Sequence, residues 1–410
     1  MMDVQNLQEK YPCLLSYMEE NGYSAGYIKS LKIEINRILQ GVNLYGWNTY
    51  EDVYLVSVKK FKSKKAVRNK RSIFGVIKRF DEENLFPHCG KRYNFLKASS
   101  YSLLSDEYKQ VIDIYRRTAK QQGKRESTIY VVSHSAENFL LELQQNGMDS
   151  FNGITEKGVL EIFFQEGKFR RNYSYKKGIL TVLKTGVPFF PENTCARVLS
   201  YLPILRDRRK NIQYLTREEV ALIKTALTDC NSTITLRNRA IGLIALYMGL
   251  RSGDIAELAL TDIDWVKDII HIKQQKNGIP LKLPLTTIVG NGIYDYLMQE
   301  RPETQCEKLF VTETHPVIQL QSSSMYGISR KIMDAAGIRK TLGNRRGFHI
   351  FRHHMAITLL ENEIAQPVIS QIMGHLSPAS IEPYLSADFS HLKECALSIE
   401  CFPLRKEVLS

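Results

Sequence analysis

Four residues near the end of the chain have the chemistry needed to act on a phosphodiester. His349 and Arg352 are three positions apart, so they share one face if their segment is helical. His375 follows a short apolar stretch, and Tyr384 comes nine positions later. A tyrosine hydroxyl attacks at neutral pH only where cations and hydrogen bonds surround its target. Because arginine binds phosphate oxygens and imidazole can move a proton, these residue types predict nucleophilic attack on phosphorus.

A helix is expected to present the second of these histidines. Pro367 suits the first turn of a helix, and Gly374 suits its end. The apolar residues Val368, Ile369 and Ile372 predict its buried face. The histidine would then stand just beyond the helix end.

The tyrosine is expected to follow the start of another helix. Ser377 and Pro378 suit an N-cap and the first helical position. Pro383 cannot donate its N–H and disfavours the α conformation in the residue before it. We therefore expect Tyr384 to open a new helical turn.

A second cation is predicted at a helix start further upstream. An apolar helix should end at Gly249, and a new helix should begin with Ser252 as its cap. Arg251 would then lie where free N–H groups and the helix dipole favour an anion.

A lysine is predicted on a β-hairpin. Asn277 and Gly278 lie between two alternating runs, which predicts a two-residue turn. Pro280 assigns the second strand to a sheet edge. Lys276 would then lie on the rim of the turn, free to reach outward.

Together these segments resemble the motif set of the tyrosine recombinases, also called phage-integrase-type recombinases. The resemblance rests on G-L-R-S-G-D, the hairpin lysine, H-I-F-R-H, M-G-H-L-S and the closing tyrosine, and covers roughly residues 211 to 400. No single motif is specific, whereas six positions in this order are. The implied fold is mainly α with a small β-sheet in the catalytic domain, an α+β arrangement. Two helical DNA-binding domains would precede that domain in a C-shaped clamp.

The resemblance also implies a role for each of six catalytic residues: Arg251, Lys276, His349, Arg352, His375 and Tyr384. The arginines would bind the non-bridging oxygens of the scissile phosphate, and the lysine would protonate the leaving 5′-oxygen. The histidines would assist by hydrogen bonding and proton transfer, and the tyrosine would form a 3′-phosphotyrosyl DNA. Neither metal nor ATP nor another cofactor is then required. Asp254 departs from the family pattern, which often has glutamate there.

The leading hypothesis is therefore a site-specific recombinase that acts as a homotetramer on duplex DNA with inverted half-sites. A nicking-closing topoisomerase would share this chemistry but needs no paired sites. A DNA-binding protein with vestigial chemistry is a further alternative, which the six intact positions argue against. A metal site is the last, because His349 and His353 are four positions apart and His375 could join them. Two arginines beside these histidines would repel a cation.

Composition indicates a globular protein that acts in the cytoplasm. At 410 residues the chain is long enough for two or three domains. Its seven cysteines are scattered and lack C-x-x-C spacing, which favours reduced thiols over a disulfide framework or zinc site. The first residues lack the pattern of a secretion signal, and no apolar run is long enough to span a membrane.

Positive charge is concentrated in the half of the chain without the catalytic motifs. The formal net charge is +13. Positions 1–100 hold 17 basic and 10 acidic residues, and positions 101–210 hold 18 and 12. The remaining 200 residues hold 21 of each sign. This asymmetry predicts a DNA-gripping module joined to a chemistry module.

Particular basic residues are candidate phosphate contacts. Positions 59–71 contain eight basic residues and no acidic one, although a solvated face is the alternative reading of such a run. The full set of candidates is Lys59, Lys60, Lys62, Lys64, Lys65, Arg68, Lys70, Arg71, Arg170, Arg171, Lys176, Lys177, Arg208 and Arg209.

Four segments are expected along the chain. Residues 1–97 should form a basic helical domain, in which a helix from 73 to 80 follows the basic run. Residues 101–205 should form a second helical domain, which resembles the family's core-binding domain and loosely repeats the first. Residues 206–214 form a basic linker. Residues 215–410 hold the catalytic domain, whose first helix should start with a capping box of Thr216 and Glu219, and a tail from 390 that covers its own core or a neighbouring subunit.

Overall fold

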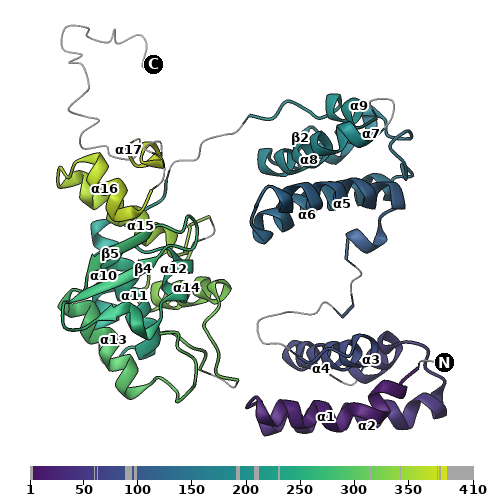
Figure 1. Ribbon diagram of the computed structural model, residues 1–410, viewed down its shortest axis with the longest axis horizontal. Helices are drawn as coiled ribbons and strands as arrows, with labels where there is room; N and C mark the ends of the chain where they lie inside the picture. Colours follow the sequence, from purple (N-terminus) through teal and green to yellow (C-terminus); the bar gives the residue numbers. More distant parts are fainter. Residues whose placement is uncertain are drawn as a thin grey trace, which may run out of the picture. The chain divides into compact units, whose positions relative to one another are not determined.

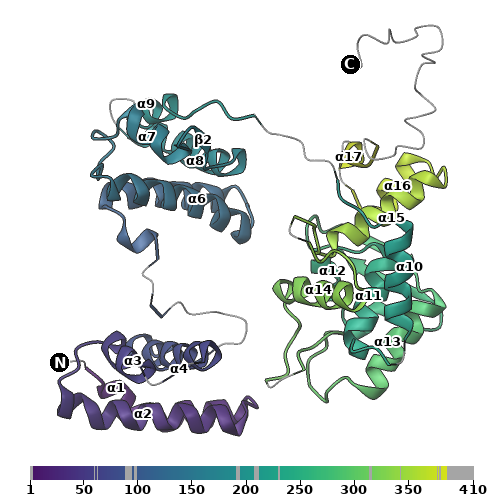
Figure 2. The same cartoon turned by 180° about the vertical axis from the view of Figure 1, so that it is seen from behind.

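The computed structural model confirms a mainly helical chain with small sheets (Figures 1 and 2). The residues it describes are 3–59, 61, 63–87, 95–96, 99–190, 194–206, 212–229, 231–313, 316–341, 343–375, 377 and 380–385. Contacts divide the chain into two compact units. Unit 1 is Tyr45–Lys78 with Arg92–Arg209, and unit 2 is Asp3–Leu44, Arg79–Lys91 and Lys210–Ser410. No helix among the described residues is both long and apolar enough to cross a membrane.

The regular elements among the described residues of unit 1 are helices and one short hairpin. Its elements are α3 (Tyr50–Val58), most of α4 (Lys64–Glu83), α5 (Asp106–Gln121), α6 (Glu126–Gln145), α7 (Glu156–Phe163), β1 (Phe164–Gln165), β2 (Lys168–Phe169), α8 (Tyr173–Gly186) and α9 (Thr194–Ser200). Helices α6 and α8 lie side by side (Figure 1). Phe139 and Ile179, one from each, are fully buried. The β1–β2 hairpin was not expected from the sequence.

The part of the basic run from Lys64 to Arg71 belongs to α4, whereas Lys59 is the C-cap of α3, and the expectation of a separate helix starting at residue 73 is wrong. Helix α4 begins at Lys64 and runs unbroken to Glu83. Lysine, arginine and alanine favour helices, and no proline interrupts the segment. Phe74 and Phe80 are buried on one side of the same helix, and the ring of Phe74 meets that of Tyr54 on α3.

Unit 2 holds the catalytic motifs. Its elements are α1 (Gln5–Glu20), α2 (Ala25–Tyr45) up to Leu44, the last turn of α4, α10 (Arg217–Thr228), α11 (Leu236–Met248), α12 (Ser252–Glu257), β3 (Ile263–Asp264), β4 (Ile269–Lys273), β5 (Pro280–Pro284), α13 (Thr287–Gln299), α14 (Met325–Ala335), α15 (His349–Glu361), α16 (Gln366–Met373) and α17 (Glu382–Leu385). The capping box of Thr216 and Glu219 at the start of α10 is confirmed.

Helix α11 is the centre of the catalytic core. It is buried along nearly its whole length and packs against α10, α13, α14 and α15. Small residues permit this close approach: a Cβ on Gly292 of α13 would lie 2.5 Å from the Leu243 side chain. Because α11 cannot shift among so many neighbours, Gly249 at its end has a fixed position.

A three-stranded antiparallel sheet lies beside this core. Its strand order is β3-β4-β5, with Ile270 paired to Leu283. Strand β5 is an edge strand, as Pro280 predicts. The sheet carries the connection between β4 and β5 that contains Lys276.

Candidate active site

Arg251 is positioned by the junction of two helices. Gly249 ends α11 in the left-handed conformation, with φ of 60°, as predicted. The N-cap of α12 is Arg251 itself, whereas Ser252 was expected to be the cap. Leu250 is buried directly after Gly249. Helix α12 then begins at Ser252, one residue earlier than it would begin if Ser252 were the cap.

The Arg251 guanidinium is held by polar groups from other elements. Nη1 donates to Oε1 of Gln274 at 2.9 Å, and Nη2 donates to the Gly374 carbonyl at 3.4 Å. Asp254 is 3.8 Å away and buried, and its other oxygen accepts from the Gln275 N–H at 2.7 Å. Gln274 and Asp254 therefore orient the Arg251 guanidinium and leave the side chain partly exposed.

Arg352 is buried in α15 and is held by backbone carbonyls. Its Nη1 donates to the Gly249 carbonyl at 2.9 Å, and its Nη2 donates to the Met373 carbonyl. Burial, reinforced by the Arg251 charge, lowers the pKa of Arg352 to about 10. The guanidinium therefore stays charged at neutral pH and lies beside a second cation, an arrangement suited to an anion.

His375 is fixed by the end of α16. Gly374 has a φ of 59°, its N–H donates to Gln371, and the His375 N–H donates to Ser370 at 2.8 Å. This pair of bonds is a Schellman motif, so the predicted glycine stop is confirmed. Of the apolar face expected for this helix, Ile369 is buried, but Val368 is 44% exposed because it lies on the outer side of the turn.

Tyr384 lies in the third position of α17 and is 7% exposed. The expectation that it opens a new turn is wrong, because Pro383 occupies the first turn, where its missing N–H costs nothing. The positive charges of Arg352 and Arg251 act on the tyrosine hydroxyl. Burial raises its pKa, and Arg352 and Arg251 oppose that rise. The hydroxyl is therefore protonated at neutral pH and must lose its proton during any attack. Pro378, the second residue of the predicted N-cap pair, lies outside the described residues.

Three histidines surround the tyrosine or its neighbours. The His375 ring stacks on the Tyr384 ring with centroids 6.2 Å apart, and the His353 ring meets it edge-on at 5.5 Å. His349 begins α15 and contacts His353. Burial and nearby positive charge lower the pKa values of His349 and His375 to about 4. Both imidazoles are therefore neutral at pH 7.

Lys276 is exposed between β4 and β5, as expected, but the turn is longer than the predicted two residues. Gln274 and Ile279 close it with a backbone bond of 3.0 Å, and the Gly278 N–H donates to the Gln274 carbonyl. The Asn277 side chain donates to the Gly374 carbonyl at 2.9 Å.

Comparisons with known proteins agree with this arrangement. The model of the phage integrase family matches residues 213–391. The curated protein named "Putative integrase/recombinase y4gC" of Sinorhizobium fredii is 34% identical over 185 residues, covering 45% of this chain and 94% of the relative. The chain belongs to the phage integrase family.

Two further matches have lower sequence identity but cover more of this recombinase. Tyrosine recombinase XerA of Thermococcus onnurineus is 27% identical over 286 residues, which cover 70% of this chain and 93% of the relative. The solved structure of XerH site-specific recombinase bound to palindromic difH substrate matches with a TM-score of 0.55 and 17% identity. That match covers 73% of this chain and 96% of the other, and it shows a shared fold. The chain is a tyrosine-type recombinase, an enzyme that cuts and rejoins DNA strands at specific sites.

The candidate DNA contacts of this recombinase differ in environment. Lys59, Lys64, Lys65 and Arg68 are exposed, Lys70 and Arg71 are half-buried, and Lys60 and Lys62 lie outside the described residues. Arg170 and Arg171 both bind Glu142 at 2.6 Å, so their charges are partly satisfied within the protein. Lys176 is half-buried and Lys177 is exposed on α8, and Arg208 and Arg209 lie outside the described residues.

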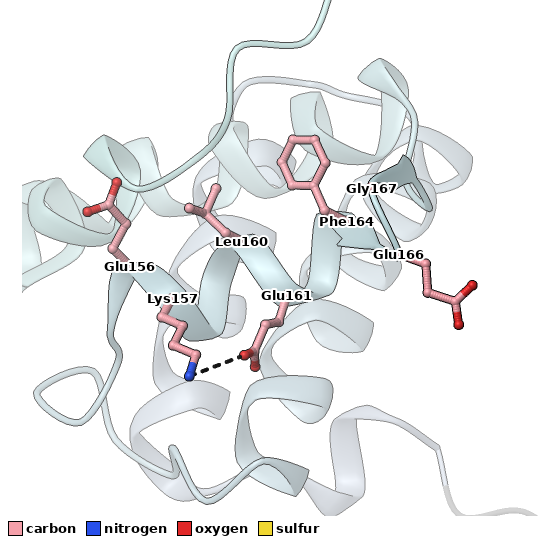
Figure 3. Close-up of a pocket in the computed structure, with 7 residues that line it drawn as sticks. All are labelled: Glu156, Lys157, Leu160, Glu161, Phe164, Glu166 and Gly167. Carbon is pink, nitrogen blue, oxygen red and sulfur yellow. Dashed lines mark ion pairs between the residues drawn. The ribbon is translucent and has the colours of Figure 1, made fainter.

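Two other features of the recombinase bear on alternative sites. Within the described ranges, no group of three or more histidines, cysteines, aspartates or glutamates is placed to hold a metal ion. An open groove of about 560 Å³ lies along α7 and β1 of unit 1 and is lined by Glu156, Glu161 and Glu166 (Figure 3). Lys157 forms an ion pair with Glu161 there at 3.9 Å. The groove is acidic and contains none of the six catalytic candidates.

Sequence reasoning did not give three residues the roles that they have in this site, although Asn277 was expected in the turn and His353 was considered as a metal ligand. Gln274 holds Arg251, Asn277 binds the α16 helix end, and His353 packs against Tyr384. The only available signal was the histidine that follows Arg352 directly in H-I-F-R-H. The other two are polar residues in or next to the expected turn, and each also binds a carbonyl about a hundred positions away.

Proposed function

We propose that this recombinase cuts and rejoins DNA through Tyr384, without metal or ATP. The observation that supports this assignment is the position of the Tyr384 ring, which stacks on the His375 ring at 6.2 Å and meets the His353 ring at 5.5 Å, with Arg352 and Arg251 near enough for their charges to act on the hydroxyl. A phosphodiester lying against both guanidinium groups would present its phosphorus to that hydroxyl. Fixed cations at the equatorial oxygens then stabilise the charge that develops in the transition state.

The proposed step conserves atoms and charge. The Tyr384 oxygen forms a bond to phosphorus, and the bond to the 5′-oxygen breaks. The hydroxyl proton passes to a neutral imidazole of His349 or His375, directly or through water. Lys276 gives a proton to the leaving 5′-oxygen. The phosphotyrosyl bond keeps the energy of the original linkage, so a second DNA 5′-hydroxyl can reverse the step without ATP.

The proposed partner is duplex DNA with inverted half-sites, bound by a homotetramer in the cytoplasm. The basic residues of positions 1–210 would grip the backbone, and residues 215–410 would carry the chemistry. The segment from 390 onward would join subunits; it lies outside the described residues. Integration of a mobile element and resolution of replicon dimers would both use this chemistry.

Substitution Tyr384→Phe tests the nucleophile. Only the attacking oxygen is lost, so DNA binding should persist while covalent protein–DNA adducts disappear. Adducts are measured by denaturing gel after incubation with DNA in EDTA, and wild-type protein should form them under the same conditions. Adducts at the wild-type level in the variant would remove Tyr384 from this role.

The same assay separates recombination from simple nicking and closing. Plasmids with one copy of a target site and plasmids with two are compared. A recombinase exchanges strands only between two sites, whereas a topoisomerase relaxes both plasmids. Relaxation without any exchanged product would contradict the proposed function.

A further inference from the structure

The end of α16 binds the side chains of several catalytic candidates. The last carbonyls of a helix have no partner within it and carry the negative end of its dipole. The Met373 carbonyl accepts from Arg352 and from Gln274 Nε2, the latter at 3.3 Å. The Gly374 carbonyl accepts from Arg251 at 3.4 Å and from Asn277 Nδ2 at 2.9 Å.

Asn277 differs from the other donors because it carries no charge and lies beside Lys276. Its bond joins the turn to a residue 97 positions away, next to His375. The Lys276 charge contributes to lowering the pKa of His375, so the two groups are close enough to interact.

The turn is also anchored on the other side of the lysine. The Gln275 N–H donates to Asp254, which is 2% exposed, at 2.7 Å. Lys276 therefore has an anchored neighbour on each side, while its own side chain is exposed. Two fixed neighbours restrict the backbone of the lysine and leave its long side chain able to reach outward.

We propose that Asn277 is a positioning residue that holds Lys276 in place to protonate the leaving oxygen. The proposal rests on the role of Lys276 as the general acid. Without the bond to Gly374, the turn keeps its anchors at Gln274 and Gln275, which precede the lysine, but loses the side-chain contact that follows it, so the lysine samples a wider range of positions. Misplacing a catalytic group by about 1 Å can cost on the order of a hundredfold in rate.

The test compares two DNA substrates under single-turnover conditions with the full chain. One is ordinary DNA, and the other has sulfur in place of the 5′-bridging oxygen, which leaves without needing a proton. Asn277→Ala should slow cleavage of ordinary DNA by about ten- to a hundredfold and slow cleavage of the sulfur substrate far less. Asn277→Asp should behave alike, because it keeps the acceptor that faces the Ile279 N–H but replaces the donor with a carboxylate oxygen, which the Gly374 carbonyl repels.

Two controls make each outcome decisive. Asn291→Ala makes the same change at an exposed position of α13 and should leave both rates at wild-type values. Lys276→Ala should be rescued by the sulfur substrate; if it is not, the general-acid assignment fails regardless of Asn277. If Lys276→Ala is rescued but Asn277→Ala is equally slow on both substrates, or is as fast as wild type on ordinary DNA, the positioning role is wrong.

Discussion

At the residue scale, the charges around Tyr384 act on one another and set the protonation states of the site. Burial and the cations Arg352, Arg251 and Lys276 lower the pKa of His375 to about 4. His349 reaches the same value through burial and a different set of neighbours, led by His353 and Arg345. Both imidazoles are therefore neutral at pH 7 and able to accept a proton. An exposed histidine would already be partly protonated below its ordinary pKa of about 6.5.

This difference in neighbours predicts a selective response to Lys276→Gln. Removing one cation should raise the titration midpoint of His375, since its charged form is repelled less, and should leave that of His349 unchanged. Histidine NMR signals recorded from pH 3.5 to 8 in the free protein would measure both midpoints. Equal shifts, or none at His375, would contradict the proximity of Lys276 to His375.

The direction of the shift also determines how stability responds to acid. A folded-state pKa below the ordinary value means that the unfolded chain binds more protons between the two values. The stabilisation contributed by each neutral imidazole is therefore present above about pH 6.5 and is lost as the pH falls towards 4.

At the element scale, the end of α16 combines a local backbone requirement with a packing requirement. Gly374 has a positive φ, and a Cβ there would lie 2.1 Å from the amide nitrogen of Gln274. Gln274 cannot move aside freely, because it binds Arg251 and the Met373 carbonyl. The glycine is therefore required both by the turn and by the side chain that orients an arginine.

Gly374→Ala should reduce cleavage as well as stability. Gly123→Ala is the matched control, because Gly123 has a similar φ of 68° and nothing within 4 Å of the position that a Cβ would occupy. Both changes introduce left-handed strain of about 1–2 kcal/mol, but only the first displaces Gln274. Thermal unfolding and single-turnover cleavage are measured for both variants. Full cleavage activity in Gly374→Ala would show that the Gln274 contact does not matter.

At the scale of the whole molecule, charge and chemistry are separated along the chain. The net charge of +13 comes from positions 1–210, whereas the six catalytic candidates lie between 251 and 384. Affinity for the phosphate backbone and the ability to cut it should therefore be separable by substitution.

Neutralising Lys59, Lys64, Lys65 and Arg68 with glutamine should weaken DNA binding and flatten its salt dependence. Each phosphate contact contributes about 0.9 to the slope of log K against log salt, so losing up to four contacts should lower it by about 3 to 4. The matched control neutralises four exposed lysines elsewhere, Lys10, Lys120, Lys157 and Lys267. Equal slopes for the two variants would indicate that the basic run at positions 59–71 faces solvent.

The sequence by itself determined features that depend on neighbours within a few positions. The helix ends at Gly249 and Gly374, the capping box at Thr216 and the edge position of β5 all follow from local backbone chemistry. The order of the six catalytic positions was visible for the same reason, since each lies in a short recognisable segment.

Only the tertiary structure decided which polar groups meet across the site. Arg352 binds a carbonyl 103 positions away, and Asn277 binds one 97 positions away. The length of the Lys276 turn, the pairing of Arg170 and Arg171 with Glu142, and the exposure of Val368 depend on which elements pack together. Short spacings in a sequence carry no record of such contacts, because the partners become neighbours only when the core around α11 forms.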